Sequence, residues 1–260
     1  MPTNYAHYRF GTDLLDRLPP DIRRTVSRFR QLYDMGQHGP DLLLYFDPAF
    51  PNAVAKLGKK CHQQTGADFF KRACRILRMS PSEGAMAYLY GVLGHYVLDS
   101  TCHPYISRMV DADLGRHNQI ETALDYRLLT MDGKKPHLYD QSTHMQLTPG
   151  ECETVAMFYP NLRGAAVKQC VKRMKSCTQF LTMPEGTRRN LVSKTMAKVR
   201  PGAADLIVPL TPDPKLQEST ENLLRLYDMA LDRYLPLLEQ IQEHMKRKTP
   251  LGTAFALIFG

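Results

Sequence analysis

Two histidine–carboxylate pairs, each spaced four residues apart, constrain the fold of this chain more than any other feature. The first pair is His95 and Asp99, the second is His117 and Glu121, and His103 lies between them. On an α-helix, residues i and i+4 lie one turn apart on the same face, so each pair can present an imidazole and a carboxylate to one cation. The spacing therefore predicts two helices that face each other across a polynuclear metal site.

The ligand types suit zinc, and the same ligands would also accept manganese, iron or nickel. Imidazole nitrogen and carboxylate oxygen are ordinary zinc ligands, and a catalytic zinc site keeps one position open for water. A single pair of this kind is more often a hydrogen bond that contributes ~0.2–0.5 kcal/mol, but two pairs with a histidine between them favour a metal site. Pro104 predicts that the first helix ends near His103, which would displace His103 toward the second pair and a second metal.

Helix signals recur along the chain, whereas no alternating strand pattern bounded by hairpin turns stands out. Residues 80–83 (Ser-Pro-Ser-Glu) and 148–151 (Thr-Pro-Gly-Glu) each offer an N-cap, a proline at the first helical position and a glutamate at the third. Helices are expected over about 81–101, 114–129, 148–159, 162–181, 184–199 and 217–247. In the last of these, Pro236 predicts a kink, and the residues expected to face inward are Leu223, Leu224, Tyr227, Leu231, Tyr234, Leu235, Leu238 and Ile241.

A stripe of small residues on the first ligand helix predicts close packing of another helix. Each glycine inside a helix costs about 1 kcal/mol relative to alanine, so a tight helix contact is the expected compensation. The stripe consists of Gly84, Ala87, Gly91 and Gly94.

These signals predict an all-α, single-domain multi-helix bundle. We expect a metal-binding helical domain over residues 1–200. Residues 201–260 are expected to form a proline-rich link (201–214) and a long C-terminal helix that packs on the same domain.

Composition places the chain among ordinary globular proteins. It has 260 residues, of which 43% are hydrophobic and 23% charged. The N-terminus lacks a basic segment followed by an apolar run, no apolar stretch is long enough to span a bilayer, and the six cysteines show no CxxC spacing. We therefore expect a cytoplasmic protein with free thiols and without a transmembrane segment.

Part of the net charge of +8 is concentrated in one segment. Between residues 163 and 200 the only acid is Glu185, so this segment predicts a surface for phosphate groups, whether of lipid headgroups at a membrane, of nucleic acid or of smaller esters. A solvated helix face is the alternative, and the absence of interleaved aromatic residues disfavours a dedicated single-strand binder. The basic residues are Arg163, Lys168, Lys172, Arg173, Lys175, Arg188, Arg189, Lys194, Lys198 and Arg200.

Three features of the first 62 residues are weak individually but informative together with the later pairs. They are His7, the Gly39-Pro40-Asp41 turn and His62. In that order, followed by the His95-xxx-Asp99-xxx-His103 run and the His117-xxx-Glu121 pair, they resemble the zinc-dependent phospholipase C family. The superfamily of this family also contains zinc-dependent single-strand nucleases. The resemblance covers most of positions 5–130.

The resemblance implies an all-helical fold that holds up to three zinc ions at the bottom of a cleft. One zinc would be held by Asp41, His62, His95 and Asp99, and another by His103, His117 and Glu121. Asp99 would bridge to a third zinc, to which His7 would also bind.

Two departures from the family pattern affect this assignment. Secreted members complete the third site with an N-terminal tryptophan, but this chain has no tryptophan, so two zinc sites are expected and the third lacks that ligand. Removal of Met1 would make the amine of Pro2 the alternative. The spacing of Asp99 and His103 is also two residues shorter than in the secreted enzymes.

The resemblance implies a metal-dependent phosphoric-ester hydrolase that uses a metal-activated hydroxide, with Asp41 orienting the water or acting as general base. The substrate would be a phosphoester, with phospholipids among the candidates. One alternative is a single-strand nuclease on the same metal cluster. Another is a non-catalytic zinc-stabilised helical binding protein, which the scarcity of thiolate ligands disfavours. The chain has no G-x-S-x-G elbow, Walker loop or G-x-G-x-x-G turn to support another catalytic class.

Overall fold

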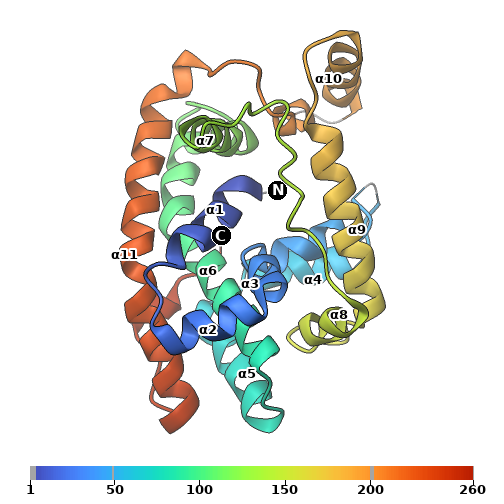
Figure 1. The fold of residues 1–260 in the computed structure, drawn as a ribbon. Coiled ribbons are helices and arrows are strands. Elements are labelled where there is room, and N and C mark those ends of the chain that lie inside the picture. Colours follow the sequence, from blue (N-terminus) through green and yellow to red (C-terminus); the bar gives the residue numbers. More distant parts are fainter. Residues whose placement is uncertain (1–3, 49, 200–201, 260) are drawn as a thin grey trace.

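The computed structural model describes residues 4–48, 50–199 and 202–259, and these form the all-α fold that the sequence predicts (Figure 1). Within them, β pairing is limited to an isolated bridge between Thr65 and Ile258. None of the described helices is both long and apolar enough to cross a bilayer. The α-helices are α1 (Asn4–Leu14), α2 (Pro20–Arg28), α3 (Arg30–Gly36), α4 (Ala53–His62), α5 (Gly66–Met79), α6 (Glu83–Asp111), α7 (His117–Met131), α8 (Pro149–Ala156), α9 (Gly164–Leu181), α10 (Thr187–Val199) and α11 (Gln217–Arg247). The 3-10 helices are η1 (Gly39–Tyr45), η2 (Ala203–Leu206), η3 (Pro214–Leu216) and η4 (Thr253–Ala256).

Helix α6 forms the centre of the core, and α3 packs closely against its glycine stripe as predicted. A Cβ atom added at Gly91 would lie 2.8 Å from the Cα of Gly36, so no larger side chain fits there. This close approach places the next segment, η1, beside His95. Gly39 begins η1 with a φ of +47°, and a Cβ added there would lie 2.6 Å from Cδ2 of His95. Glycine is therefore required at position 39 for two reasons: the backbone has a positive φ, and His95 leaves no room for a Cβ atom.

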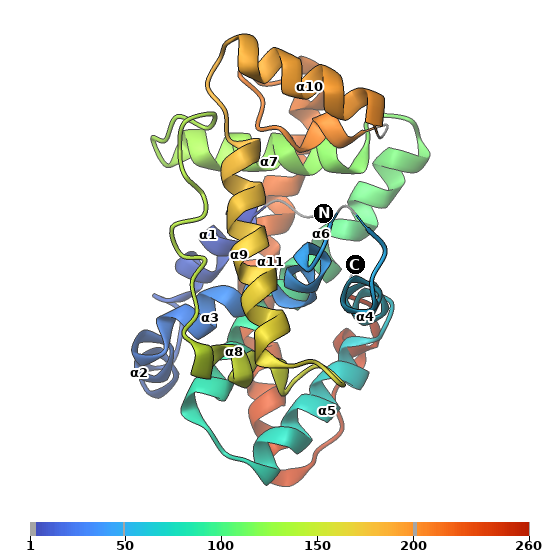
Figure 2. The same cartoon turned by 90° about the vertical axis from the view of Figure 1, so that its right-hand side faces the viewer.

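Helix α11 packs against α6, as Figure 1 shows along one side of the molecule. The hydroxyl of Tyr234 donates a hydrogen bond of 2.9 Å to the carbonyl of Tyr90, and the predicted inward face is buried or packed against the core. Pro236 lies within the helix, which extends from Gln217 to Arg247 as the pattern predicted. Helices α7 and α10 lie at one end of the molecule and α5 at the other (Figures 1 and 2).

The expectation that the first ligand helix ends near Pro104 is wrong, because α6 continues to Asp111. A proline inside a helix removes one backbone hydrogen bond and introduces a steric clash. Tertiary contacts on both sides of Pro104 offset this cost. Cys102 and Ile106 are buried, and the amide of Asn222 in α11 donates a 3.1 Å hydrogen bond to the hydroxyl of Tyr105. His103 consequently stays on the helix, one turn after Asp99.

Two predicted helix starts are also corrected. The second ligand helix begins at His117 instead of Leu114, because Asp113 and Gly115 have positive φ angles that no right-handed helix contains. Helix α6 is capped by Ser82 instead of Ser80, since the Ser82 hydroxyl accepts a hydrogen bond from the backbone N–H of Ala85. The other predicted cap, at Thr148, is confirmed with its reciprocal Glu151 contact.

Candidate metal centre

Three of the predicted ligands project from one face of α6, where the helix repeat places them. Asp99 lies between two histidines: its Oδ2 is 3.2 Å from Nε2 of His95, and its Oδ1 is 3.6 Å from Nδ1 of His103. The helix that carries them is held in the core by α3 on one side and α11 on another. The carboxylate and the two imidazoles are therefore presented on a rigid element.

The orientation of His95 is fixed by the backbone of the α3–η1 connection. Its Nδ1 donates a 3.1 Å hydrogen bond to the carbonyl of Gln37, so Nε2 faces the Asp99 carboxylate with a lone pair. Burial lowers the pKa of His95 to about 4, which keeps the imidazole neutral. Two acceptor atoms that face each other inside a protein require a cation between them or a proton on one of them. Because the His95 imidazole is neutral, a metal cation fits between its Nε2 and the Asp99 carboxylate better than a proton on the imidazole does.

A second facing pair of acceptors comes from η1 and α4. Nε2 of His62 lies 2.7 Å from Oδ1 of Asp41, while its Nδ1 donates a 2.8 Å hydrogen bond to the carbonyl of Gly58. Oδ2 of Asp41 is buried without a hydrogen-bond partner and lies 3.9 Å from Nδ1 of His95. Burial alone would lower the pKa of His62, but the Asp41 carboxylate raises it overall. A contact of 2.7 Å between these two acceptor atoms requires a shared proton or a cation.

His7 enters the centre from α1. Its Nε2 lies 3.2 Å from Oδ1 of Asp99, and its ring stacks on that of His95 with the ring centroids 4.6 Å apart. Burial would lower the pKa of His7, but Asp99 raises it overall. His7 therefore shares with His95 the carboxylate at the middle of the centre.

Asp125 positions α1 and was not singled out by the sequence pattern. Its carboxylate accepts hydrogen bonds from the backbone N–H groups of Tyr5 and Ala6, at 3.1 and 2.8 Å. These are donors of the first helical turn, which have no partner within the helix. Asp125 lies one turn after Glu121 on α7, so its place at i+8 from His117 is the signal that could have identified it.

The remaining ligand candidates connect α6 and α7. Oε1 of Glu121 lies 3.1 Å from Nε2 of His117 and 3.4 Å from Nε2 of His103. Burial would raise the pKa of Glu121, but the hydrogen bonds from His103 and His117 lower it to about 2. For His103, burial would lower the pKa, whereas Asp99 and Glu121 raise it to about 10. His103 therefore lies between two carboxylates that belong to different helices.

All eight residues singled out from the sequence meet in this one place. Ligand atoms of His7, Asp41, His95 and Asp99 form one group, and those of His103, His117 and Glu121 form another, each within 4.8 Å. His62 adjoins the first group through Asp41. His7 belongs to the first group, and Pro2 lies outside the described residues.

Unpartnered polar atoms test whether this residue set fits a metal. Buried polar atoms without a partner are costly, and oxygen and imidazole nitrogen in this number and arrangement match the ligand preferences of zinc. The residues therefore fit bound zinc. Among the described residues, the buried ligand atoms without a hydrogen-bond partner include Asp41 Oδ2, His95 Nε2, Asp99 Oδ2, His103 Nδ1 and Glu121 Oε2.

The centre is most exposed at the N-terminal end of α7. The side chain of His117 is 42% exposed, compared with 17% for His62 and 15% for His103. The other five residues are buried. Access from solvent is therefore greatest at His117.

A buried pair of histidines lies outside the predicted set. Nε2 of His38 is 2.7 Å from Nε2 of His144, and Tyr8 stacks on His144 with the ring centroids 4.0 Å apart. Burial lowers the pKa of both imidazoles, that of His144 to about 3, so the two are neutral and one donates to the other. Their pairing across distant segments has no local sequence signal.

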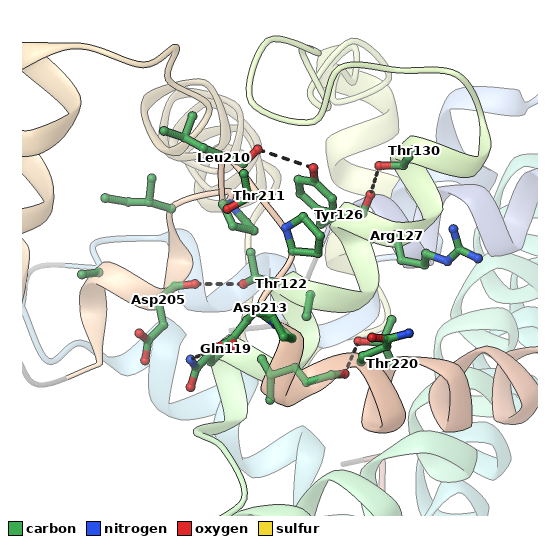
Figure 3. A pocket seen from close by; sticks show the side chains of 18 of the residues that line it. Gln119, Thr122, Tyr126, Arg127, Thr130, Asp205, Leu210, Thr211, Asp213 and Thr220 are labelled. Carbon is green, nitrogen blue, oxygen red and sulfur yellow. Dashed lines mark hydrogen bonds between the residues drawn. The ribbon is translucent and has the colours of Figure 1, made fainter.

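A cavity of about 820 Å³ lies on the other face of α7, away from the ligands. Figure 3 shows Thr122 donating to the carbonyl of Asp205 and Tyr126 donating to that of Leu210 in its wall. These polar groups are already partnered within the protein. None of the eight ligand candidates lines this cavity, so it is separate from the metal centre.

Comparison with known proteins identifies a family for the larger part of the chain. A family model described as zinc dependent phospholipase C matches residues 6–161. All eight ligand candidates lie within the matched range. Searches of curated proteins and of solved structures gave no significant match.

Proposed function

Because the chain belongs to the zinc-dependent phospholipase C family, we propose that it is a metal-dependent phosphoric-ester hydrolase with its active centre at the eight clustered residues. The observation that supports this most directly is the contact between His95 and Asp99. A neutral imidazole, oriented by the Gln37 carbonyl, faces a buried carboxylate at 3.2 Å with no donor between them. Such an arrangement suits a metal cation, and the family is zinc-dependent.

Two ligand sets would hold the metal. The first comprises Asp41, His62, His95 and Asp99, with His7 on the same carboxylate, and the second comprises His103, His117 and Glu121. Bound zinc would lower the pKa of a water molecule toward neutrality and neutralise charge on the phosphoryl oxygens. The hydrogen bonds from His95 to Gln37 and from His62 to Gly58 fix which imidazole nitrogen faces the metal.

Asp41 is the candidate for orienting the attacking water. Its Oδ1 is held by His62, whereas its Oδ2 has no hydrogen-bond partner and can accept a proton from that water. The carboxylate is buried and anchored in η1, beside Gly39. We assign Asp41 both a ligand role through one oxygen and a proton-accepting role through the other.

The proposal is tested first by metal analysis and then by turnover. Purified protein should contain at least one zinc ion per chain and hydrolyse a chromogenic phosphocholine ester. The Asp41→Asn variant should lose about 100-fold or more in kcat, the usual contribution of a general base. Asp47→Asn serves as the matched control, because this half-buried carboxylate near the end of η1 is not among the clustered ligand residues.

Three results would redirect the proposal. A metal content below one ion per chain would contradict it. Hydrolysis of single-stranded DNA in preference to the phosphocholine ester would support a nuclease on the same centre. Full metal loading with neither activity would support a zinc-stabilised binding protein, although histidine and carboxylate ligands with an exposed edge at His117 favour catalysis over a closed structural site.

A further inference from the structure

Helix α10 differs from the other described α-helices in having no buried residue. Two of its apolar side chains, those of Leu191 and Val199, are 66% and 80% exposed, whereas Val192 and Met196 are half-buried. A surface helix of a globular protein normally turns its apolar residues toward the core. Here the apolar side chains of the outer face meet solvent instead.

Basic residues surround these apolar side chains. Arg188, Lys194 and Lys198 are exposed, and α10 contains no acidic residue. Leu191, Lys194 and Lys198 are spaced at i, i+3 and i+7, which places the leucine and the two lysines on one face. Of the basic segment noted in the sequence, Arg200 lies outside the described residues.

A short path of contacts connects α10 with the exposed edge of the metal centre. The chain leaves α10 at Val199 and soon forms η2, where Asp205 accepts hydrogen bonds from Arg116 at 2.5 and 2.6 Å. Arg116 is the residue that precedes His117 at the start of α7. Segment η2 contacts both α10 and α7, and Figure 2 shows these two helices at the same end of the molecule. The basic, partly apolar helix is thus connected through η2 to the residue that precedes His117, the most exposed ligand candidate.

We propose that the outer face of α10 docks the protein on an anionic phospholipid surface. Lysines beside exposed aliphatic side chains suit the interface of a bilayer, where cations meet the headgroups and apolar groups enter the acyl boundary. A nucleic acid backbone has no apolar surface for Leu191 and Val199 to contact. Helix α10 also has no aromatic side chain on which bases could stack. The observations therefore favour a membrane over a nucleic acid.

The inference deepens the proposed function and rests on it in one respect: docking would bring phospholipid, as substrate, to the His117 edge. Binding to the surface itself does not require hydrolysis. The two claims can therefore be tested separately, by vesicle binding and by turnover of a soluble ester.

Vesicle co-sedimentation tests the docking. The full chain should bind vesicles of phosphatidylcholine mixed with phosphatidylserine, bind phosphatidylcholine vesicles more weakly, and lose affinity as salt is raised. Lys194→Glu combined with Lys198→Glu should weaken binding to the anionic vesicles at least about tenfold. Leu191→Ser should also weaken it without a change in charge.

The matched control is Lys71→Glu combined with Arg75→Glu. These exposed cations have the same i,i+4 spacing on α5, at the opposite end of the molecule (Figure 2). The control variant should keep most of the vesicle affinity, and circular dichroism of all variants should match that of the unaltered chain.

Absence of vesicle binding by the unaltered chain would overturn the proposal, as would equal losses in the α5 and α10 variants. Tighter binding to a single-stranded oligonucleotide than to anionic vesicles, lost in the α10 variant, would also overturn it and assign the face to nucleic acid. Turnover of the soluble phosphocholine ester should be unchanged in the α10 variants. If the unaltered chain binds vesicles but hydrolyses no ester, the docking stands and the proposed function fails.

Discussion

Oδ1 of Asp99 lies 3.2 Å from Nε2 of His7, a residue of the first helix, while Oδ2 of the same carboxylate lies 3.2 Å from Nε2 of His95. Nδ1 of His103 is 3.6 Å from Oδ1. One buried carboxylate is therefore shared by three imidazoles from two helices. It is the structural connection between the two groups of ligand candidates.

Replacement of Asp99 should remove more metal than replacement of His7. Asp99→Ala removes a carboxylate of the first group that also lies 3.6 Å from His103 of the second, whereas His7→Ala leaves His95, Asp41 and the second group in place. Mutation of a residue that only hydrogen-bonds to a metal ligand weakens metal binding roughly 10–100-fold. Loss of Asp99, which would bind the metal itself, should weaken zinc binding by more than that. Elemental analysis of the two purified variants provides the measurement, and equal metal content would rule out the shared role.

Asp125 should affect the centre through the placement of α1. Asp125→Ala removes the acceptor for the Tyr5 and Ala6 N–H groups, so the free energy of unfolding should fall by about 1–2 kcal/mol. Zinc affinity should fall by roughly tenfold as His7 becomes less constrained. Thr148→Ala is the control: it removes the cap of α8, and should lower stability by about 1 kcal/mol without changing zinc affinity. Unchanged zinc affinity in the Asp125 variant would show that α1 is held by other contacts.

Zinc affinity should increase with pH. Burial would lower the pKa of His103, but Asp99 and Glu121 raise it to about 10, so the metal-free protein holds a proton there at neutral pH. A metal must displace this proton, and affinity therefore rises by about tenfold per pH unit for each proton released. Competition with a chelating dye between about pH 6 and 8 measures the slope, which should be shallower in His103→Ala. A zinc affinity of the unaltered chain that does not change with pH would contradict this prediction.

The contact between α3 and α6 should tolerate no side chain at position 91. Gly91→Ala places a Cβ 2.8 Å from the Cα of Gly36, and should lower the free energy of unfolding by about 1–3 kcal/mol or more because backbone must move. Gly150→Ala is the matched control. A Cβ there has no neighbour within 4 Å, so this change in α8 should be neutral or stabilise by about 0.4–1 kcal/mol. Chemical denaturation measures the free energy of unfolding of both variants. Equal values would show that the contact between α3 and α6 can relax to accept a side chain.

Local sequence patterns predicted the helices, and the pairing of His95 with Asp99 and of His117 with Glu121, where the relevant physics is local. The i,i+4 spacing of His95 and Asp99 needs only the helix repeat, and the capping box at Thr148 needs only one turn of chain. The same local reasoning failed at Pro104. The intrinsic cost of a proline predicted a helix end there, but packing of Ile106 in the core and the contact of Asn222 with Tyr105 keep the helix intact.

The sequence by itself determined the all-α class and the two helices that carry His95/Asp99 and His117/Glu121, because helical periodicity is carried by neighbouring residues. A family resemblance, and not periodicity, indicated His7, Asp41 and His62. Only the tertiary structure decided that His7 shares the carboxylate of Asp99, that Asp125 positions α1, and that α10 has no buried residue and contacts η2. These relationships join residues far apart in the chain. They depend on which helix faces meet in the folded core, and no local pattern encodes that.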